Sequence, residues 1–311
     1  MKTLVVGAGA VGGFFGGRVL QAGGDVTFLV RPRRAEQLRR DGLVLRAPRG
    51  ETRVPAPPTV LASDLREPFD LVLLSCKAFD LDDAIASFAP AVGPNTAIVP
   101  LLNGMRQLDV LDARFGREQV LGGMCAVATM LQDDGTIVQF NDLLDFAFGE
   151  RDGARTPRTE AIAAELGRGF PTRLSDAILQ EMWEKWVLIV TIAGITSLMR
   201  APVGDIVAAG AADVALALQD ECADIASAHG YPPRAASAER LRKNITTPGS
   251  PLTASMFRDI EAGRRTEADH IVGDLLRRAD PAHPTPVLRI VQAHLATYEA
   301  RRTREAPSPR A

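Results

Sequence analysis

Lys185 lies between Trp183 and Trp186, near the start of one of the most apolar stretches of the chain, residues 181–206 (EMWEKWVLIVTIAGITSLMRAPVGDI). An ammonium in apolar surroundings is costly unless it is paired or has a chemical task. If the stretch is a helix, Glu181 and Lys185 are four residues apart and can form an ion pair on its surface. The alternative is that Lys185 is the proton donor of an active site, and its position beside the apolar run favours this.

A second candidate group is a carboxylate far downstream, in the segment TASMFRDIEAGRRTEADHIVGDLL. Gly263 interrupts one predicted helix, and Thr266 is placed to cap another whose first residue is Glu267. A carboxylate at a helix N-terminus is stabilised by the helix dipole, so Glu267 can serve as a cap. Its alternative role is to face Lys185 or a polar substrate.

A glycine-rich segment at the N-terminus, TLVVGAGAVGGFFGG, contains Gly7, Gly9 and Gly12 in GxGxxG spacing. It directly follows a predicted strand and opens a predicted helix. In this context Gly7 makes a tight turn, Gly9 lets the backbone approach a pyrophosphate, and Gly12 lets the helix pack on the strand. The helix N-terminus, with Ala10 and Val11, then faces the phosphates. The segment predicts a dinucleotide-binding site.

A basic segment, FLVRPRR, follows the second predicted strand, where enzymes that bind NAD usually carry Asp or Glu. Arg31, with Arg33 and Arg34 behind it, offers guanidinium groups that suit a 2′-phosphate. The segment can also be a solvated basic loop. We predict NADP (NADPH) as the cofactor.

Polar residues also follow two later strands. SCKAFD places Lys77, and LLNGM places Asn103 and Gly104, at the carboxyl edge of the predicted sheet, where ligands bind in such folds. An Asn-Gly pair is also typical of an ordinary turn. We expect Lys77 and Asn103 to belong to the site.

The first half of the chain alternates short apolar strands with helical stretches, which predicts an α/β Rossmann-type doubly wound sheet over residues 1–172. The strands expected there are 3–6, 26–30, 71–75, 97–101, 120–128, 137–140 and 145–148, with helices over 11–22 and 81–88. Residues 173–302 are predicted to form an all-α C-terminal domain. The helical stretches expected there are 211–228, 235–244, 253–262, 267–279 and 287–301. Residues 303–311 look like a disordered tail.

Composition excludes several classes of protein. A formal net charge of −2 gives no basic surface for nucleic acid, and the apolar run 186–199 is shorter than the roughly 20 residues that span a bilayer. Three scattered cysteines and four scattered histidines form no disulfide framework and no CxxC or HExxH metal motif. We expect a cytoplasmic protein of 311 residues that binds no metal, nucleic acid or membrane.

The motifs GAGAVGG, CKAFD, LNGM, EMWEKW and SMFRDIEAGRRTE, together with Arg31, resemble those of the ketopantoate reductases (2-dehydropantoate 2-reductases) over nearly the whole chain. The resemblance implies a Rossmann domain, a helical domain, and NADPH-dependent reduction of a small 2-oxo acid in pantothenate biosynthesis. It implies catalytic roles for Lys185, as the general acid, and for Asn103 and Glu267. It also implies substrate binding by these three residues and by Ser255, and coenzyme binding by Gly7, Gly9, Ala10, Val11, Gly12, Arg31, Lys77 and Asn103.

The chain departs from this family where asparagines hold the substrate hydroxyl. The positions concerned are Ile189, Ala193, Val203 and Leu252. A missing partner for a buried hydroxyl changes discrimination by orders of magnitude. We therefore expect a more apolar pocket, with Arg200 as either a grip for a carboxylate or a surface residue.

Three functions stay open. They are the 2-dehydropantoate 2-reductase reaction, a related hydroxy-acid dehydrogenase with another substrate, and a non-catalytic NADP-binding sensor. The sequence permits a monomer or a homodimer.

Overall fold

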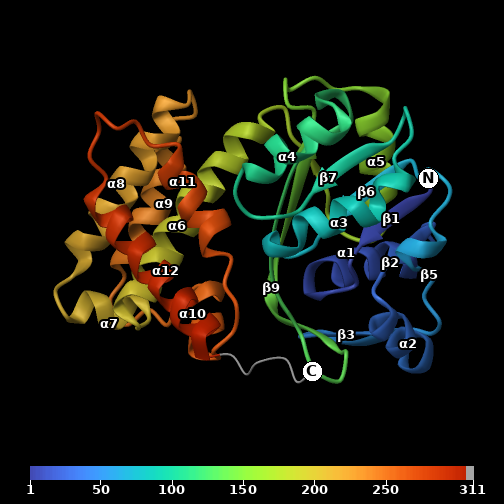
Figure 1. Cartoon of the computed structure of the whole chain (residues 1–311), viewed down its shortest axis with the longest axis horizontal. Coiled ribbons are helices and arrows are strands. Elements are labelled where there is room, and N and C mark those ends of the chain that lie inside the picture. Colours follow the sequence, from blue (N-terminus) through green and yellow to red (C-terminus); the bar gives the residue numbers. More distant parts are fainter. Residues whose placement is uncertain (306–311) are drawn as a thin grey trace. The chain divides into compact units, whose positions relative to one another are not determined.

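The computed structural model describes residues 1–305 and divides into two compact units (Figure 1). Of the described residues, unit 1 comprises 1–102 and 107–179, and unit 2 comprises 103–106 and 180–305. The division falls after Leu179, a little beyond the predicted boundary at residue 172. The short segment Asn103–Arg106 is set between strand and helix residues of unit 1 but makes its contacts in unit 2.

Unit 1 contains a parallel five-stranded sheet, as the continuous apolar runs predicted. Its strands are, in spatial order, β5 (Thr59–Val60), β2 (Val26–Leu29), β1 (Thr3–Val6), β6 (Leu71–Leu74) and β7 (Ala97–Pro100). In the centre of this sheet Val5 pairs with Phe28 on one side and with Leu73 on the other. The chain builds outward from β1 through β2 and then returns to β6, so the order reverses beside β1. Ligands bind at such a reversal in doubly wound folds.

A second sheet in unit 1 was not predicted as a separate layer. Its strands are β10 (Arg173–Leu174), β9 (Ile137–Gly149), β3 (Leu43–Ala47) and β4 (Gly50–Val54), with β8 (Gly122–Leu131) antiparallel to β9. The two strands expected at 137–140 and 145–148 are parts of the single strand β9. The helices of this unit are α1 (Ala10–Gln21), α2 (Pro32–Asp41), α3 (Leu81–Phe88), α4 (Arg106–Phe115) and α5 (Pro157–Leu166).

The glycines of α1 let this helix pack closely against both sheets. A Cβ atom on Gly16 would lie 2.8 Å from Phe28 in the parallel sheet, and one on Gly17 would lie 2.7 Å from Leu43 in the second sheet. Glycine weakens a helix interior by about 1 kcal/mol relative to alanine. The close approach to two layers explains why the sequence nevertheless repeats glycine pairs there.

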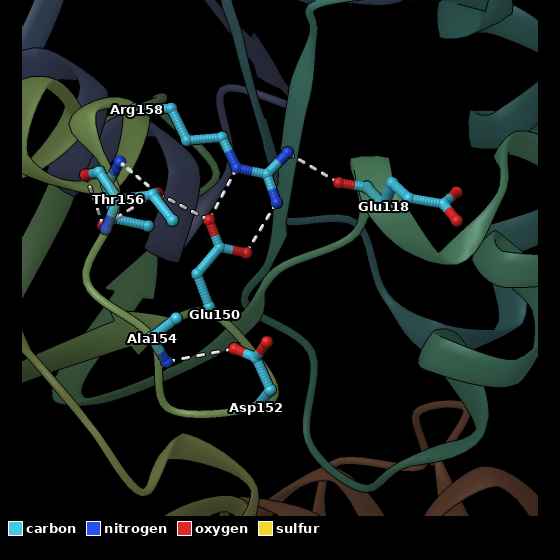
Figure 2. A network of polar contacts seen from close by, with 7 residues as sticks. Glu118, Glu150, Asp152, Ala154, Thr156 and Arg158 are labelled. Carbon is cyan, nitrogen blue, oxygen red and sulfur yellow. Dashed lines mark hydrogen bonds and ion pairs between the residues drawn. The ribbon is translucent and has the colours of Figure 1, made fainter.

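A polar network closes the end of β9 (Figure 2). The buried Glu150 accepts hydrogen bonds from Nε and Nη2 of Arg158, at 2.7 and 2.5 Å, and from the Thr156 hydroxyl at 2.7 Å. Arg158 also donates to the carbonyl oxygen of Glu118, at 2.6 Å. The hydrogen bonds from Arg158 hold the pKa of Glu150 below its usual range. We call these four residues the Glu150 network.

Unit 2 is helical, as predicted. Its helices are α6 (Ile178–Met199), α7 (Val203–Ala208), α8 (Ala212–Ala228), α9 (Ala235–Thr246), α10 (Ser255–Glu261), α11 (Asp274–Arg277) and α12 (Pro286–Glu305), with a π-helix, η5 (Asp269–Gly273), before α11. Because α12 continues to Glu305, residues 303–305 are helical where a disordered tail was predicted. The rest of that tail, residues 306–311, lies outside the described residues.

The long helix α6 contains the apolar run that was judged too short for a membrane. Among residues 1–305 it is the one helix whose length and composition would allow it to cross a bilayer. In unit 2, however, α6 is largely buried, and Trp186, Val190 and Ile195 are fully enclosed. These features are typical of the core helix of a helical domain.

Candidate functional site

The glycine-rich turn in unit 1 has the geometry that a dinucleotide phosphate requires. Gly7 has φ +94°, which L side chains rarely adopt, and a Cβ on Gly12 would lie 2.0 Å from the hydroxyl of Ser75. A Cβ on Gly9 would instead meet no protein atom within 4 Å. Gly9 is the N-cap of α1, and the first turn of that helix carries no acidic residue. The space beside Gly9 at the start of α1 is thus open, which would suit the close approach of a pyrophosphate.

The half-buried Ala10 and Val11 form the first turn of α1, beside these glycines. Arg31 follows β2 and is the N-cap of α2, and Lys77 follows β6 as an exposed residue. The carboxyl ends of β1, β2 and β6 lie at the same edge of the parallel sheet. Unit 1 therefore brings all the predicted coenzyme residues except Asn103 to one edge.

The two arginines after β2 have different surroundings. The exposed Arg31 donates from Nη2 to Oδ1 of Asp80 at 3.0 Å, and this hydrogen bond raises the pKa of Arg31. Arg34 is half-buried, donates to the carbonyl oxygen of Ala8 at 3.1 Å and to Gln37, and has its pKa lowered by burial. Arg34 thus supports the glycine-rich turn from within the protein, whereas Arg31 is accessible to a ligand.

Lys185 is half-buried on α6, between side chains that fix this helix in unit 2. The neighbouring Glu184 is buried and accepts hydrogen bonds from Nε and Nη2 of Arg234, both at 2.7 Å, and from the Arg234 backbone N–H. Burial alone would raise the pKa of Glu184, but the bonds from Arg234 and Gln180 outweigh it and lower the pKa. On the other side, Trp186 donates from its indole nitrogen to the carbonyl oxygen of Ile271 at 2.8 Å.

The turn containing Asn103 lies against the same part of unit 2. A Cβ on Gly104, whose φ is +88°, would lie 3.6 Å from the Trp186 indole nitrogen and from Cδ2 of His270. His270 is buried and forms a hydrogen bond with the backbone of Asn103. Because this bond raises the pKa of His270, we take the ring as its donor and the Asn103 carbonyl as its acceptor.

His270 and the π-helix that carries it were not identified from the sequence. Burial lowers the pKa of His270, and the nearby carboxylates of Glu267 and Asp274 oppose this effect. The sequence offers only a histidine and a glycine in the apolar segment HIVG, after the predicted cap. Such residues are too common to predict a π-helix or a role for His270. The structure thus adds His270 to the residues gathered around Asn103 and Glu267.

The half-buried Glu267 lies just before the π-helix, and its carbonyl oxygen accepts from the N–H of Ile271 at 2.9 Å. Thr266 does not cap the helix as predicted. Its hydroxyl and its N–H both donate to Oε1 of Glu299, each at 2.7 Å. The π-helix that follows has Ala268 at its N-cap and no side-chain cap, and Thr266 is instead tied to a carboxylate of α12 that is distant in the sequence.

The four apolar positions where the resemblance led us to expect asparagine lie in α6, in α7 and in the loop before α10. The N–H of Val203 donates to the carbonyl oxygen of Leu252 at 3.0 Å, which brings two of these positions together. Ala193 is buried and Ile189 half-buried on α6. Ser255, the first residue of α10, is exposed.

Arg200 follows α6 with φ 56° and forms an ion pair with Glu261, at the end of α10. Both side chains are exposed. At about 1.5 Å per residue, α6 extends about 21 Å from Lys185 to Met199. The ion pair and this separation favour a surface role for Arg200 over a grip on a substrate at Lys185.

Within residues 1–305, no group of three or more His, Cys, Asp or Glu side chains is arranged to hold a metal ion. Cys76, Cys125 and Cys222, all within the described residues, are not in disulfide bonds.

Comparison with known proteins finds a family match in each of the two units. The family model described as "Ketopantoate reductase PanE/ApbA" matches residues 3–153, and that of its C-terminal domain matches residues 177–299. The "Uncharacterized oxidoreductase YkpB" of Bacillus subtilis is 38% identical over 303 residues, which cover 96% of this chain and 99% of the relative.

Two solved structures show the same fold. The PanE/ApbA family ketopantoate reductase from Ralstonia eutropha JMP134 superposes with a TM-score of 0.87 at 25% identity, covering 97% of this chain and all of the other. A D-mandelate dehydrogenase solved with NADH and anilino(oxo)acetate superposes equally well, with a TM-score of 0.87 at 21% identity and 97% and 100% coverage, and shows the fold alone. With both family models and a full-length relative matched, the chain belongs to the ketopantoate reductase family of oxidoreductases, which act on CH–OH groups.

Proposed function

We propose that this protein reduces a 2-oxo acid to the corresponding 2-hydroxy acid with NADPH, in a reaction of the 2-dehydropantoate 2-reductase type. The observation that carries the proposal is the convergence in unit 2 of three distant segments. They are the Asn103 turn, the Lys185–Trp186 part of α6, and residues 267–273. Family membership supports the same chemistry.

In this reaction NADPH, when bound, supplies a hydride to the carbonyl carbon of the 2-oxo acid. The oxygen of that carbonyl then takes up a proton, and Lys185 is the group that we propose as its donor. An ammonium also stabilises the negative charge that develops on the oxygen. Half-burial of Lys185 strengthens this interaction, because less water screens it.

We assign positioning of the substrate to the groups around Lys185. The Asn103 amide can hydrogen-bond the carbonyl group and the nicotinamide, Glu267 can bind the polar end of the substrate, and Ser255 can bind its carboxylate. His270 holds the backbone of Asn103, so the amide starts from a fixed turn. Pre-orientation of this kind lowers the entropy cost of reaching the reactive geometry.

For the coenzyme we propose NADP(H), with Arg31 on the 2′-phosphate. The end of β2 carries this exposed guanidinium where enzymes that use NAD carry a carboxylate. Lys77 and the turn from Gly7 to Gly12 would hold the remaining phosphates. Replacing Arg31 with Ala should weaken NADPH binding by tenfold or more, about the free energy of one charge-assisted hydrogen-bonded contact, and leave NADH binding nearly unchanged.

A second candidate substrate is a branched 2-oxo acid without a hydroxyl group. The Val203–Leu252 contact favours it, because neither side chain can hydrogen-bond a hydroxyl. The test is NADPH oxidation with 2-dehydropantoate and with trimethylpyruvate, which lacks only that hydroxyl. Equal or faster turnover of trimethylpyruvate would support the apolar pocket, whereas a preference for 2-dehydropantoate above about 100-fold would require a hydroxyl partner. No reduction of any 2-oxo acid would refute the proposed function.

A further inference from the structure

The ion pair between Arg31 and Asp80 lies across the carboxyl end of β1. Arg31 follows β2, and Asp80 ends the short 3₁₀ turn after β6, while β1 lies between these two strands. Neighbouring strands are about 4.8 Å apart, so β2 and β6 are separated by about 10 Å. Arg31 Nη2 and Asp80 Oδ1 close this distance to 3.0 Å. The pair therefore lies beside the turn that begins at Gly7.

The two partners differ in exposure. The side chain of Arg31 is 74% exposed and that of Asp80 is 33% exposed. The carboxylate is thus the better-fixed partner, and the long arginine side chain reaches toward it. Asp83, in the first turn of α3, adds a second negative charge nearby.

We propose that Asp80 is a coenzyme-selectivity residue, whose carboxylate competes with the 2′-phosphate of NADPH for the Arg31 guanidinium. This inference rests on the role of Arg31 in the proposed function. One guanidinium edge is bonded to Asp80, and any phosphate on Arg31 lies close to that carboxylate and is repelled by it. NADH has no phosphate at this position, so Asp80 penalises NADPH alone. Asp80 thereby reduces the preference for NADPH over NADH that Arg31 creates.

The test replaces Asp80 with Asn, which keeps the shape and a hydrogen-bond acceptor but removes the charge. Binding of adenosine 2′,5′-bisphosphate and of 5′-AMP is measured by titration calorimetry, which needs no catalysis. A partly exposed ion pair contributes little, so we expect the bisphosphate to bind about two- to fivefold more tightly to Asp80→Asn. Binding of 5′-AMP should not change. The gain should shrink in 1 M salt, where the Debye length is about 3 Å.

The matched control is Glu36→Gln, which removes the carboxylate partner of Arg39 on the exposed face of α2. It should leave the affinity for both nucleotides unchanged. Unchanged or weaker binding of the bisphosphate to Asp80→Asn would overturn the inference. So would an equal gain when Arg31 is already alanine, because the effect would then not act through Arg31.

The Arg31→Ala variant separates this inference from the proposed coenzyme. If Arg31→Ala weakens bisphosphate binding while Asp80→Asn has no effect, the assignment of NADPH as coenzyme is supported and the proposed competition by Asp80 is refuted. If it leaves bisphosphate binding unchanged, both the NADPH assignment and the competition are refuted.

Discussion

The Glu150 network in unit 1 differs from the candidate site in unit 2 in the atoms that its hydrogen bonds join. We call that candidate site, formed by the Asn103 turn, the Lys185–Trp186 part of α6 and residues 267–273, the three-segment site. In the Glu150 network, Thr156 and Arg158 lie within a few residues of Glu150 and bond its carboxylate directly through their side chains. In the three-segment site, side chains bond backbone atoms instead. Trp186 bonds the carbonyl oxygen of Ile271, and His270 bonds the backbone of Asn103.

The difference separates a structural network from a candidate site. A carboxylate with three hydrogen bonds has little capacity left for a ligand, and its charge is balanced by Arg158. In the three-segment site the bonded groups are buried rings and backbone atoms, and the side chains of Lys185, Asn103 and Glu267 are half-buried. We propose that these three side chains face the substrate, on a support that backbone bonds and buried rings help to fix.

The largest expected effect comes from Lys185→Ala. Loss of a general acid typically lowers a rate by about 10²–10⁴-fold, and we expect kcat to fall by about 10³-fold. The Kd of NADPH should change by less than about twofold, because none of the contacts proposed for the coenzyme is made by Lys185. Stopped-flow reduction and nucleotide titration measure the two quantities.

Lys243→Ala is the matched control for this variant, since Lys243 is an exposed lysine on α9 of the same unit. Its turnover should equal that of the wild-type protein. Turnover of Lys185→Ala within threefold of wild type would make Lys185 a structural residue, and the contrast between the two regions would be lost.

The second effect concerns stability and comes from Glu150→Ala. This change leaves Arg158 without its bidentate partner and removes an acceptor from Thr156. Breaking a buried pair costs about 3–5 kcal/mol, and the partial exposure of Arg158 reduces our estimate to about 2 kcal/mol. Urea unfolding should show this loss, with kcat within twofold of wild type.

Asp145→Asn, which breaks the exposed pair with Arg173, is the control and should unfold like wild type. A large fall in kcat for Glu150→Ala in the folded protein would contradict a purely structural role.

A smaller effect is expected for His270→Phe, which keeps a ring in the core but removes the hydrogen bond to Asn103. An unpaired buried acceptor costs about 1–3 kcal/mol, and if the Asn103 turn shifts as a result, kcat/KM should fall by about tenfold. His270→Gln should recover part of the loss, because its amide can donate. A merely structural histidine would lower stability without changing kcat/KM in the folded variant, and His283→Ala, at an exposed histidine, is the control.

The sequence predicted the parallel sheet and most helices because their signals are local. The apolar runs 3–6, 71–75 and 97–101 became β1, β6 and β7 almost residue for residue. The second sheet was not predicted as a separate layer, although strands were expected at β8 and β9, because β4 (GETRV) is short and polar and so lacks an apolar pattern. Its neighbour β3 forms a local hairpin with β4 and pairs on its other side with β9, which lies far away in the chain, and this second pairing leaves no local signal.

The candidate residues could be predicted from sequence motifs, but the contacts that hold them in place could not. The bond from Trp186 to Ile271 joins residues 85 positions apart, and Ile271 lies in the π-helix. Thr266 was expected to cap the following helix because threonine is a common residue at that position. In the structure its hydroxyl bonds Glu299, which is distant in the sequence. Residue types that carry chemistry are thus readable from the sequence, whereas the contacts that fix them depend on the fold.

The smallest effect should appear in the pH dependence of stability, and it again distinguishes the two regions. Burial lowers the pKa of His270 from 6.5, with Glu267, Asp274 and Arg106 as the charged neighbours. Between that lowered pKa and 6.5 the unfolded chain binds more protons, so the free energy of unfolding falls as the pH decreases below about 6.5. In the other region the pKa of Glu150 is lowered from 4.5, so its contribution is lost only below that pH. Urea unfolding between pH 7 and about 5 should therefore show a decline in wild type that His270→Phe lacks and that Glu150→Ala retains. An equal decline in His270→Phe would show that another group, and not the histidine beside Asn103, titrates in this range.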